Sequence, residues 1–184
     1  MDVIDLHRRA AHATAAIIDR VPADQLDAPT PCSRWTIRQV VEHLVSNNRT
    51  LVARVRDGSE VDGDEVDGDD FAATAREFNE TFADPAVQST PFELGKVPTD
   101  GRGVVAMQLA DVLVHGWDIG RGAGLDVSLD DDLAAAALRI TAGIPDHVRG
   151  PDGPFGTAVP APEDAPAQDR LLSFLGRDPA WAPA

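Results

Sequence analysis

Apolar residues recur at helical spacing along most of this chain. In the first segment they fall every three to four residues, at Val3, Ile4, Leu6, Ala10, Ala13, Ile17 and Val21. A second run begins after Thr36 and stops at Gly58, and its apolar face comprises Ile37, Val40, Val41, Leu44, Leu51, Val52 and Val55. Because Gln39 follows Thr36 by three residues, the pair forms a capping box that predicts the start of a helix at Thr36.

The rest of the chain continues the helical pattern, interrupted by Pro-rich and Gly-rich stretches. We expect further helices over residues 70–82, 104–121, 128–144 (with Ser128 as its cap) and 167–175. The connections 84–102 and 150–165 hold several prolines and glycines and are expected to be loops. No alternation of strand length stands out. The pattern therefore predicts an all-α bundle, with residues 1–184 as a single domain and residues 150–184 as a strap, short helix and tail.

The helix expected over residues 104–121 is apolar on nearly all sides, which predicts a central place in the bundle. It nevertheless carries a polar stripe, made of Gln108, Asp111, His115 and Asp118. Asp111 and His115 are one turn apart, so their side chains can converge on one atom. A carboxylate and an imidazole are costly in an apolar interior unless they are paired or bound to a metal ion.

A third group for such a site lies on the helix that begins at Thr36. His43 sits at the edge of the apolar face, and Asn47 follows one turn later on the same side. If the two helices are neighbours, His43, Asp111 and His115 can form a three-ligand site for a divalent metal with open positions. The alternative is that Asp111 and His115 bond only to each other and that His43 is a lone, satisfied histidine. The spacing leaves both readings open.

Several residues near these three have candidate supporting roles. We expect Asp118 to orient a histidine or to pair with Arg121 at i+3, and Asn47 and Gln108 to face the pocket as hydrogen-bond partners. Trp35 and Trp117 fit helix packing better than pocket lining. For Cys32, a packing role is favoured over a role as nucleophile or extra ligand. No catalytic residue is assigned.

Charge and composition limit the classes of binding partner. The 184 residues include 16 Lys and Arg against 31 Asp and Glu, for a formal net charge of −15. This charge repels phosphate backbones and anionic lipid surfaces, so we expect no nucleic-acid and no membrane partner. The single cysteine excludes an intramolecular disulfide, and no apolar run approaches about 18 residues. Together these features predict a cytoplasmic protein.

Residues 57–70 form the most acidic segment, with two copies of Val-Asp-Gly-Asp followed by an acidic residue. No register places ligands and glycine as a calcium-binding EF-hand loop requires. We therefore interpret the segment as a solvated, mobile loop.

Two motifs carry a family resemblance. They are Pro31–Leu44, which ends in Thr-Ile-Arg-Gln-Val-Val-Glu-His-Leu, and Asp111–Asp118, which reads Asp-Val-Leu-Val-His-Gly-Trp-Asp. With the closing segment 165–179, they resemble the DinB-like superfamily. The match is to the actinobacterial branch similar to the N-terminal metal-binding domain of mycothiol-dependent maleylpyruvate isomerase. The resemblance implies a DinB-like four-helix bundle with additional short C-terminal helices and long loops. It also implies a divalent metal held by His43, Asp111 and His115.

The resemblance implies a function as well. Related proteins include thiol-dependent isomerases and S-transferases, so we expect a metal-dependent S-transferase that joins a mycothiol-type thiol to a small electrophile. Zn²⁺ is the favoured metal, with Ni²⁺, Mn²⁺ and Fe²⁺ as alternatives. The isomerase has glutamate where this chain has Asp111, and a further C-terminal domain contributes to its site, so the isomerase reaction is not carried over. The alternative function is a non-catalytic metal-binding or stress-related interaction module. A homodimer through bundle faces is compatible with the family.

Overall fold

The computed structural model describes residues 2–58, 70–94, 97–144, 150 and 156–183. Its four long helices are α1 (Val3–Ile18), α2 (Ile37–Asp57), α3 (Phe71–Phe82) and α5 (Gly101–Gly122). The shorter elements are η1 (Ala23–Gln25), α4 (Pro85–Gln88), β1 (Pro91–Leu94), β2 (Val97–Asp100), α6 (Asp131–Thr141) and α7 (Ala167–Phe174). The all-α bundle with extra C-terminal helices is confirmed.

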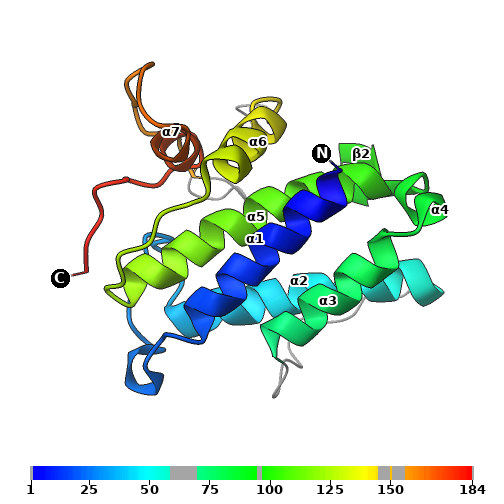
Figure 1. The fold of residues 1–184 in the computed structure, drawn as a ribbon, viewed down its shortest axis with the longest axis horizontal. Coiled ribbons are helices and arrows are strands. Elements are labelled where there is room, and N and C mark those ends of the chain that lie inside the picture. Colours follow the sequence, from blue (N-terminus) through cyan, green and yellow to red (C-terminus); the bar gives the residue numbers. More distant parts are fainter. Residues whose placement is uncertain (1, 59–69, 95–96, 145–149, 151–155, 184) are drawn as a thin grey trace.

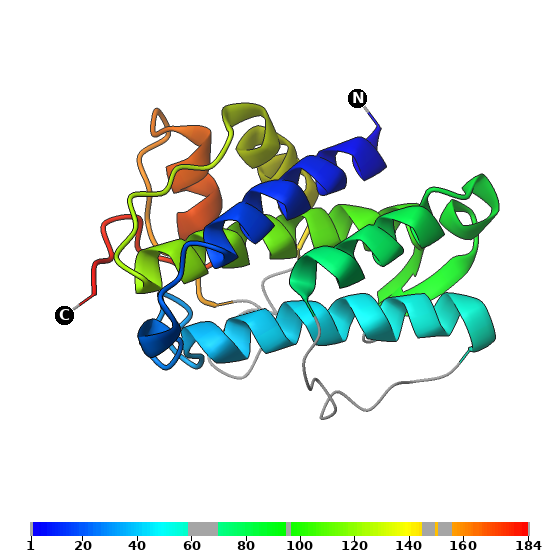
Figure 2. The ribbon, with the colours of Figure 1, turned by 60° about the horizontal axis from the view of Figure 1, so that its bottom comes forward.

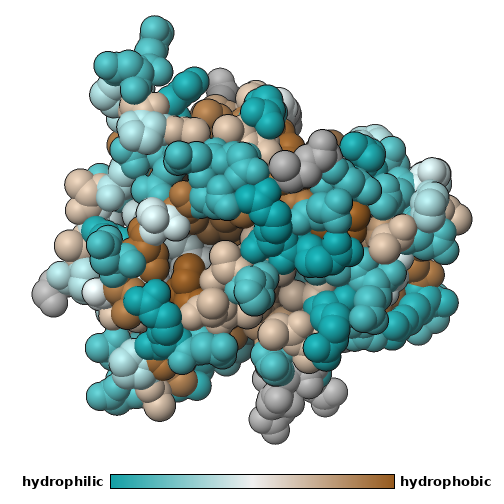
Figure 3. Space-filling view, in the orientation of Figure 1, coloured by the Kyte–Doolittle hydropathy of each residue, from teal (hydrophilic) through white to brown (hydrophobic). Residues whose placement is uncertain are grey.

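Helix α5 lies at the centre of this arrangement. Helix α1 runs beside it along most of its length, α2 and α3 pack below, and α6 and α7 cover the opposite side (Figures 1 and 2). Most residues of α5 are buried, as its nearly continuous apolar sequence predicts. Hydrophilic residues cover most of the face seen in Figure 3, with apolar side chains visible between them. Among the described residues, no helix is both long and apolar enough to cross a membrane.

The capping box predicted at Thr36 is present and begins α2. The Thr36 hydroxyl accepts a hydrogen bond from the Gln39 backbone N–H, and the Gln39 side chain accepts one from the Thr36 N–H at 3.0 Å. The helix ends at Gly58, whose φ of 72° is left-handed and suits glycine. Counted from the N-cap Thr36, His43 lies two turns into α2.

Two expectations for the connections were wrong. The segment 84–102 contains α4 and an antiparallel hairpin in which Pro91 pairs with Asp100 and Leu94 with Val97. Strands of four residues are too short to show an alternating pattern. Ser128 does not cap α6, whose N-cap is Asp130. The Leu129 N–H, just before the helix, donates instead to the Gln168 side chain of the following segment at 2.6 Å.

Close contact between α1 and α5 depends on Gly116. The Thr14 hydroxyl donates to the Val112 carbonyl at 3.0 Å, and a Cβ at position 116 would overlap that hydroxyl. We expect Gly116→Ala to lower the free energy of unfolding by about 1 kcal/mol. Overpacking by one methyl costs about 1–3 kcal/mol, offset in part by roughly 1 kcal/mol of helix propensity. Gly143→Ala, in the turn after α6, is the control for adding a methyl group without overlap, because a Cβ there meets no atom within 4 Å. Urea unfolding of both variants measures the difference, and equal stabilities would contradict the packing argument.

A buried histidine makes bundle stability depend on pH. His7 is 0% exposed, and its Nδ1 lies 2.9 Å from the Asn79 Oδ1. Burial lowers the pKa of His7 to about 4, although the Asn79 contact and Asp111 oppose the shift. The unfolded chain therefore binds this proton below about pH 6.5 and the folded chain does not, so stability is lost as pH falls toward 4. Between pH 7 and 5, wild type should lose about 2 kcal/mol more than His7→Gln in urea unfolding. If the two proteins lose the same free energy of unfolding, His7 does not cause the pH dependence.

Candidate metal centre

The three predicted ligands come together between α2 and α5. His43 Nε2 lies 3.3 Å from Asp111 Oδ2, and His115 Nε2 lies 3.4 Å from Asp111 Oδ1. One ligand atom from each of the three residues falls within 4.8 Å of the other two. The histidine rings meet edge to face, with centroids 5.1 Å apart. The condition that sequence spacing left open, contact between these two helices at this level, is therefore met.

The hydrogen bonds of His115 decide which of its nitrogens faces the site. Its Nδ1 lies 2.9 Å from Asp118 Oδ2. Burial raises the pKa of Asp118, but Arg177 and His115 outweigh it, so the net shift is downward and this carboxylate is ionised. An ionised carboxylate only accepts, so Nδ1 carries the hydrogen. In neutral His115, Nε2 then keeps its lone pair and points it at Asp111.

Asn47 makes the Nε2 atom of His43 a hydrogen-bond acceptor. Its amide nitrogen lies 3.1 Å from His43 Nε2 and 3.3 Å from Asp111 Oδ2, and an amide N–H₂ can only donate. His43 Nε2 is thus an acceptor as well. Two imidazole nitrogens and one carboxylate gather around one point, and this donor set suits a divalent metal. A metal bound there would replace the Asn47 N–H at the lone pair of His43 Nε2. The alternative is a cluster in which these side chains only bond to one another.

The surroundings of Asp111 keep its carboxyl group ionised. Burial raises its pKa, but His115 and His43 lower it further, to about 2. The residue is therefore a carboxylate at neutral pH, the form that binds metals. The side chains of His43 and Asp111 are 26% and 28% exposed, so the centre is reached from solvent.

Asp118 itself is held by a residue that sequence reasoning missed. The Asp118 side chain is 0% exposed, and Arg177 donates to it through Nη2 at 2.9 Å and Nε at 3.4 Å. The expected alternative pairing with Arg121 is wrong. Arg121 instead donates to the Trp181 carbonyl and lies over the Trp117 ring, 5.9 Å from its centroid. The helical spacing of Asp118 and Arg121 permits contact, but tertiary partners occupy both.

Trp35 takes a larger part in the site than its sequence context indicated. Its ring centroid lies 4.5 Å from that of His43 and 5.5 Å from that of His115, so it packs against both histidines. Trp117 is buried in the core, as the packing interpretation holds. Neither Trp117 nor Gln108 hydrogen-bonds to the three ligands within the described part of the chain. Gln108 is buried, and its Oε1 lacks a hydrogen-bond partner there.

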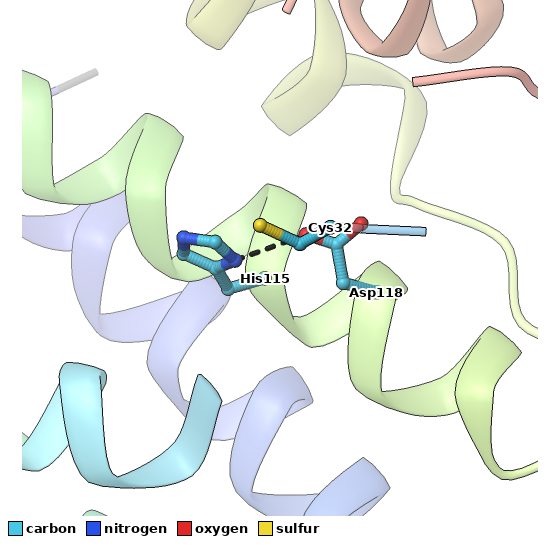
Figure 4. Close-up of side chains that lie close together, drawn as sticks. All are labelled: Cys32, His115 and Asp118. Atoms are coloured by element: carbon cyan, nitrogen blue, oxygen red, sulfur yellow. Dashed lines mark hydrogen bonds and ion pairs between the residues drawn. The ribbon is translucent and has the colours of Figure 1, made fainter. Parts of the chain in front are cut away.

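A second cluster shares His115 and contains Cys32. Figure 4 shows the Cys32 sulfur beside His115 and Asp118, and their ligand atoms lie within 4.8 Å of one another. Burial raises the pKa of the Cys32 thiol, and Arg177 opposes that rise. A metal bound here would displace the His115–Asp118 hydrogen bond and lie close to the Arg177 cation. His43, Asp111 and His115 therefore form the better candidate site for a metal, with Cys32 as a neighbour.

Most of the acidic segment 57–70 lies outside the described residues, because the structure describes nothing between 58 and 70. The same is true of residues 145–149 and 151–155, which include part of the expected strap. The solvated-loop interpretation stays a prediction.

Comparison with known proteins agrees with this architecture. Residues 7–70 match the family model described as the mycothiol maleylpyruvate isomerase N-terminal domain, a stretch that includes His43. Two relatives from Mycobacterium tuberculosis are 38% identical over 186 residues, which covers 96% of this chain and 98% of each relative. They are Uncharacterized protein Rv0738 of strain ATCC 25618 / H37Rv and Uncharacterized protein MT0763 of strain CDC 1551 / Oshkosh. No solved structure matches.

Metal content tests the donor set directly. Protein purified without a metal-affinity tag and incubated with Zn²⁺ should hold about one ion per chain by elemental analysis, because two imidazoles and a carboxylate suit that ion. The double variant His43→Ala, His115→Ala should hold none. His12→Ala, which removes an exposed histidine of α1, is the matched control and should retain the ion. Wild type without metal would contradict the metal interpretation of this donor set.

Proposed function

Since this chain belongs to the family of the mycothiol maleylpyruvate isomerase N-terminal domain, we propose that it is a divalent-metal-binding protein with His43, Asp111 and His115 as ligands. We further propose that it transfers a mycothiol-type thiol to a small electrophile. The observation that supports the metal proposal is that the Nε2 atoms of His43 and His115 lie 3.3 and 3.4 Å from the carboxylate of Asp111, with His115 held in orientation by Asp118. Zn²⁺ is the favoured ion, and Ni²⁺, Mn²⁺ and Fe²⁺ are compatible with the same donors.

Three protein ligands leave coordination positions open, which is typical of catalytic rather than structural zinc sites. A bound divalent ion would lower the pKa of a coordinated thiol, so that the reactive thiolate exists at neutral pH. The overall reaction forms a bond between the thiol sulfur and an electrophilic carbon. With a haloarene the carbon–halogen bond breaks, halide leaves and the thiol proton goes to solvent; with an epoxide a carbon–oxygen bond breaks and the alkoxide takes up a proton.

The residues around the ligands support this chemistry through orientation. Asp118 keeps the Nδ1–H tautomer of His115. Asn47 contacts both His43 and Asp111 and so fixes their relative positions. Trp35 covers one side of both imidazoles and restricts their rotation. The partial exposure of His43 and Asp111 supports access by small molecules from solvent.

The test is thiol consumption with the zinc-loaded protein, mycothiol and a panel of electrophiles such as haloarenes and epoxides. Turnover at pH 7 should exceed the protein-free rate by about tenfold or more, because a thiol pKa lowered from about 8.5 to 7 multiplies the thiolate fraction by that factor. His43→Ala should reduce turnover to the protein-free rate, while His12→Ala should not.

Two outcomes would contradict the transferase proposal. Stoichiometric zinc without turnover on any electrophile would favour the non-catalytic metal-binding module. Turnover that is unchanged by chelation or by His43→Ala would place the reaction away from this centre.

A further inference from the structure

The chain that follows α7 returns to the buried side of the metal centre. Gly176 has a φ of 82°, and a Cβ there would come within 2.8 Å of Gly156 Cα, so only glycine makes this turn. The Arg177 N–H then bonds back to the Leu172 carbonyl at 2.9 Å. This local geometry directs the Arg177 side chain inward, where it is 11% exposed.

Three groups form an unbroken chain from this turn to the metal ligand. Arg177 donates through Nε and Nη2 to the two carboxylate oxygens of Asp118, and Asp118 accepts the Nδ1–H of His115. The third donor of Arg177, Nη1, bonds to the Leu175 carbonyl at 2.8 Å and fixes the guanidinium plane. A two-pronged contact of this kind restricts the carboxylate in rotation as well as position.

Asp118 depends on Arg177 for its position. Because its side chain is fully buried, an unpaired carboxylate there is costly, and the contact with Arg177 holds it where His115 Nδ1–H can reach it. Without that contact, the acceptor that orients His115 is no longer fixed. Arg121 is not available as a substitute, since it bonds to the Trp181 carbonyl.

We propose that Arg177 is a positioning residue of the metal centre, which acts on His115 through Asp118 and couples metal binding to docking of residues 156–183 on α5. The proposal rests on the metal-binding part of the proposed function and is independent of the thiol reaction. It gives the C-terminal segment a role in the site, although none of its residues is a ligand. The coupling is reciprocal. If docking of residues 156–183 through Arg177 raises metal affinity by a given factor, the bound metal favours docking of that segment by the same factor.

Zinc affinity measured by competition with a chromophoric chelator tests the positioning role. Arg177→Gln should bind Zn²⁺ about tenfold more weakly, the lower end of the loss seen when a partner of a ligating histidine is removed. Arg177→Lys, which keeps the charge but loses the two-pronged contact, should fall between Arg177→Gln and wild type. The matched control is Arg121→Gln, which breaks the other arginine link between α5 and the C-terminal segment but leaves Asp118 untouched. It should lose clearly less affinity than Arg177→Gln, because the contact to Asp118 is intact.

A double variant tests whether Arg177 acts through Asp118. Asp118→Asn should weaken binding, and adding Arg177→Gln should weaken it no further. The proposal is overturned if Arg177→Gln is helical by circular dichroism and binds Zn²⁺ as wild type does, or if the two losses simply multiply. Equal losses in Arg177→Gln and Arg121→Gln would also overturn it, because docking alone would then explain the effect.

Hydrogen exchange on wild type supplies a readout that needs no Arg177 variant to fold. Addition of Zn²⁺ should slow exchange of the backbone amides of residues 171–177, and His115→Ala should abolish that protection. No change in wild type with Zn²⁺ bound would overturn the coupling. Failure of wild type to bind Zn²⁺ at all would instead remove the proposed function, and this inference with it.

Discussion

A helix that is buried on nearly every side yet carries ionised groups is the constraint on which this structure depends. Helix α5 forms the centre of the core, and Asp118 in its last third is 0% exposed. Leaving that charge unpaired would cost several kcal/mol, more than a bundle of this size can tolerate easily. The surrounding chain must therefore bring compensating groups to α5. Arg177 does so from the segment after α7, and His115 does so from the same helix.

The demand for compensation explains why segments remote in sequence meet at one place. Helix α2 brings His43 and Asn47 to Asp111, and the turn before α2 brings Cys32 and Trp35 to His115. Satisfying Asp118 has a further consequence, because it orders the tautomer of His115 and leaves a lone pair facing another carboxylate. Asp111 faces this lone pair and accepts a hydrogen bond from Asn47. The imidazole of His115 thus bonds to a buried carboxylate on one side and faces a partly exposed one on the other, which is the feature that the proposed metal site uses.

Sequence reasoning succeeded where local rules decide the outcome. The capping box at Thr36 placed the start of α2, and the one-turn spacing of Asp111 and His115 put both on one face of α5. It failed where tertiary partners override local ones. The i+3 spacing offered Arg121 to Asp118, but Arg177, 59 residues away, took that position. The Gly-Arg-Asp-Pro stretch at residues 176–179 lies after the last helix, within the closing segment that resembles the family. Its charge and the buried acid on α5 were the signal that could have linked them.

The role of the C-terminal segment follows from the same electrostatics. The matched family model covers residues 7–70, so it contains His43 but neither Asp111 and His115 nor Arg177. The donor set is complete only when α5 docks on α2, and His115 is held in its tautomer only when the turn at Gly176 closes on α5. The orientation of His115 is set through the buried carboxylate of Asp118, so it depends on residues outside α5 as well as on α5 itself. In the proposed metal centre, affinity for the ion therefore depends on how well residues 156–183 are docked on α5, because Arg177 of that segment holds Asp118 in place.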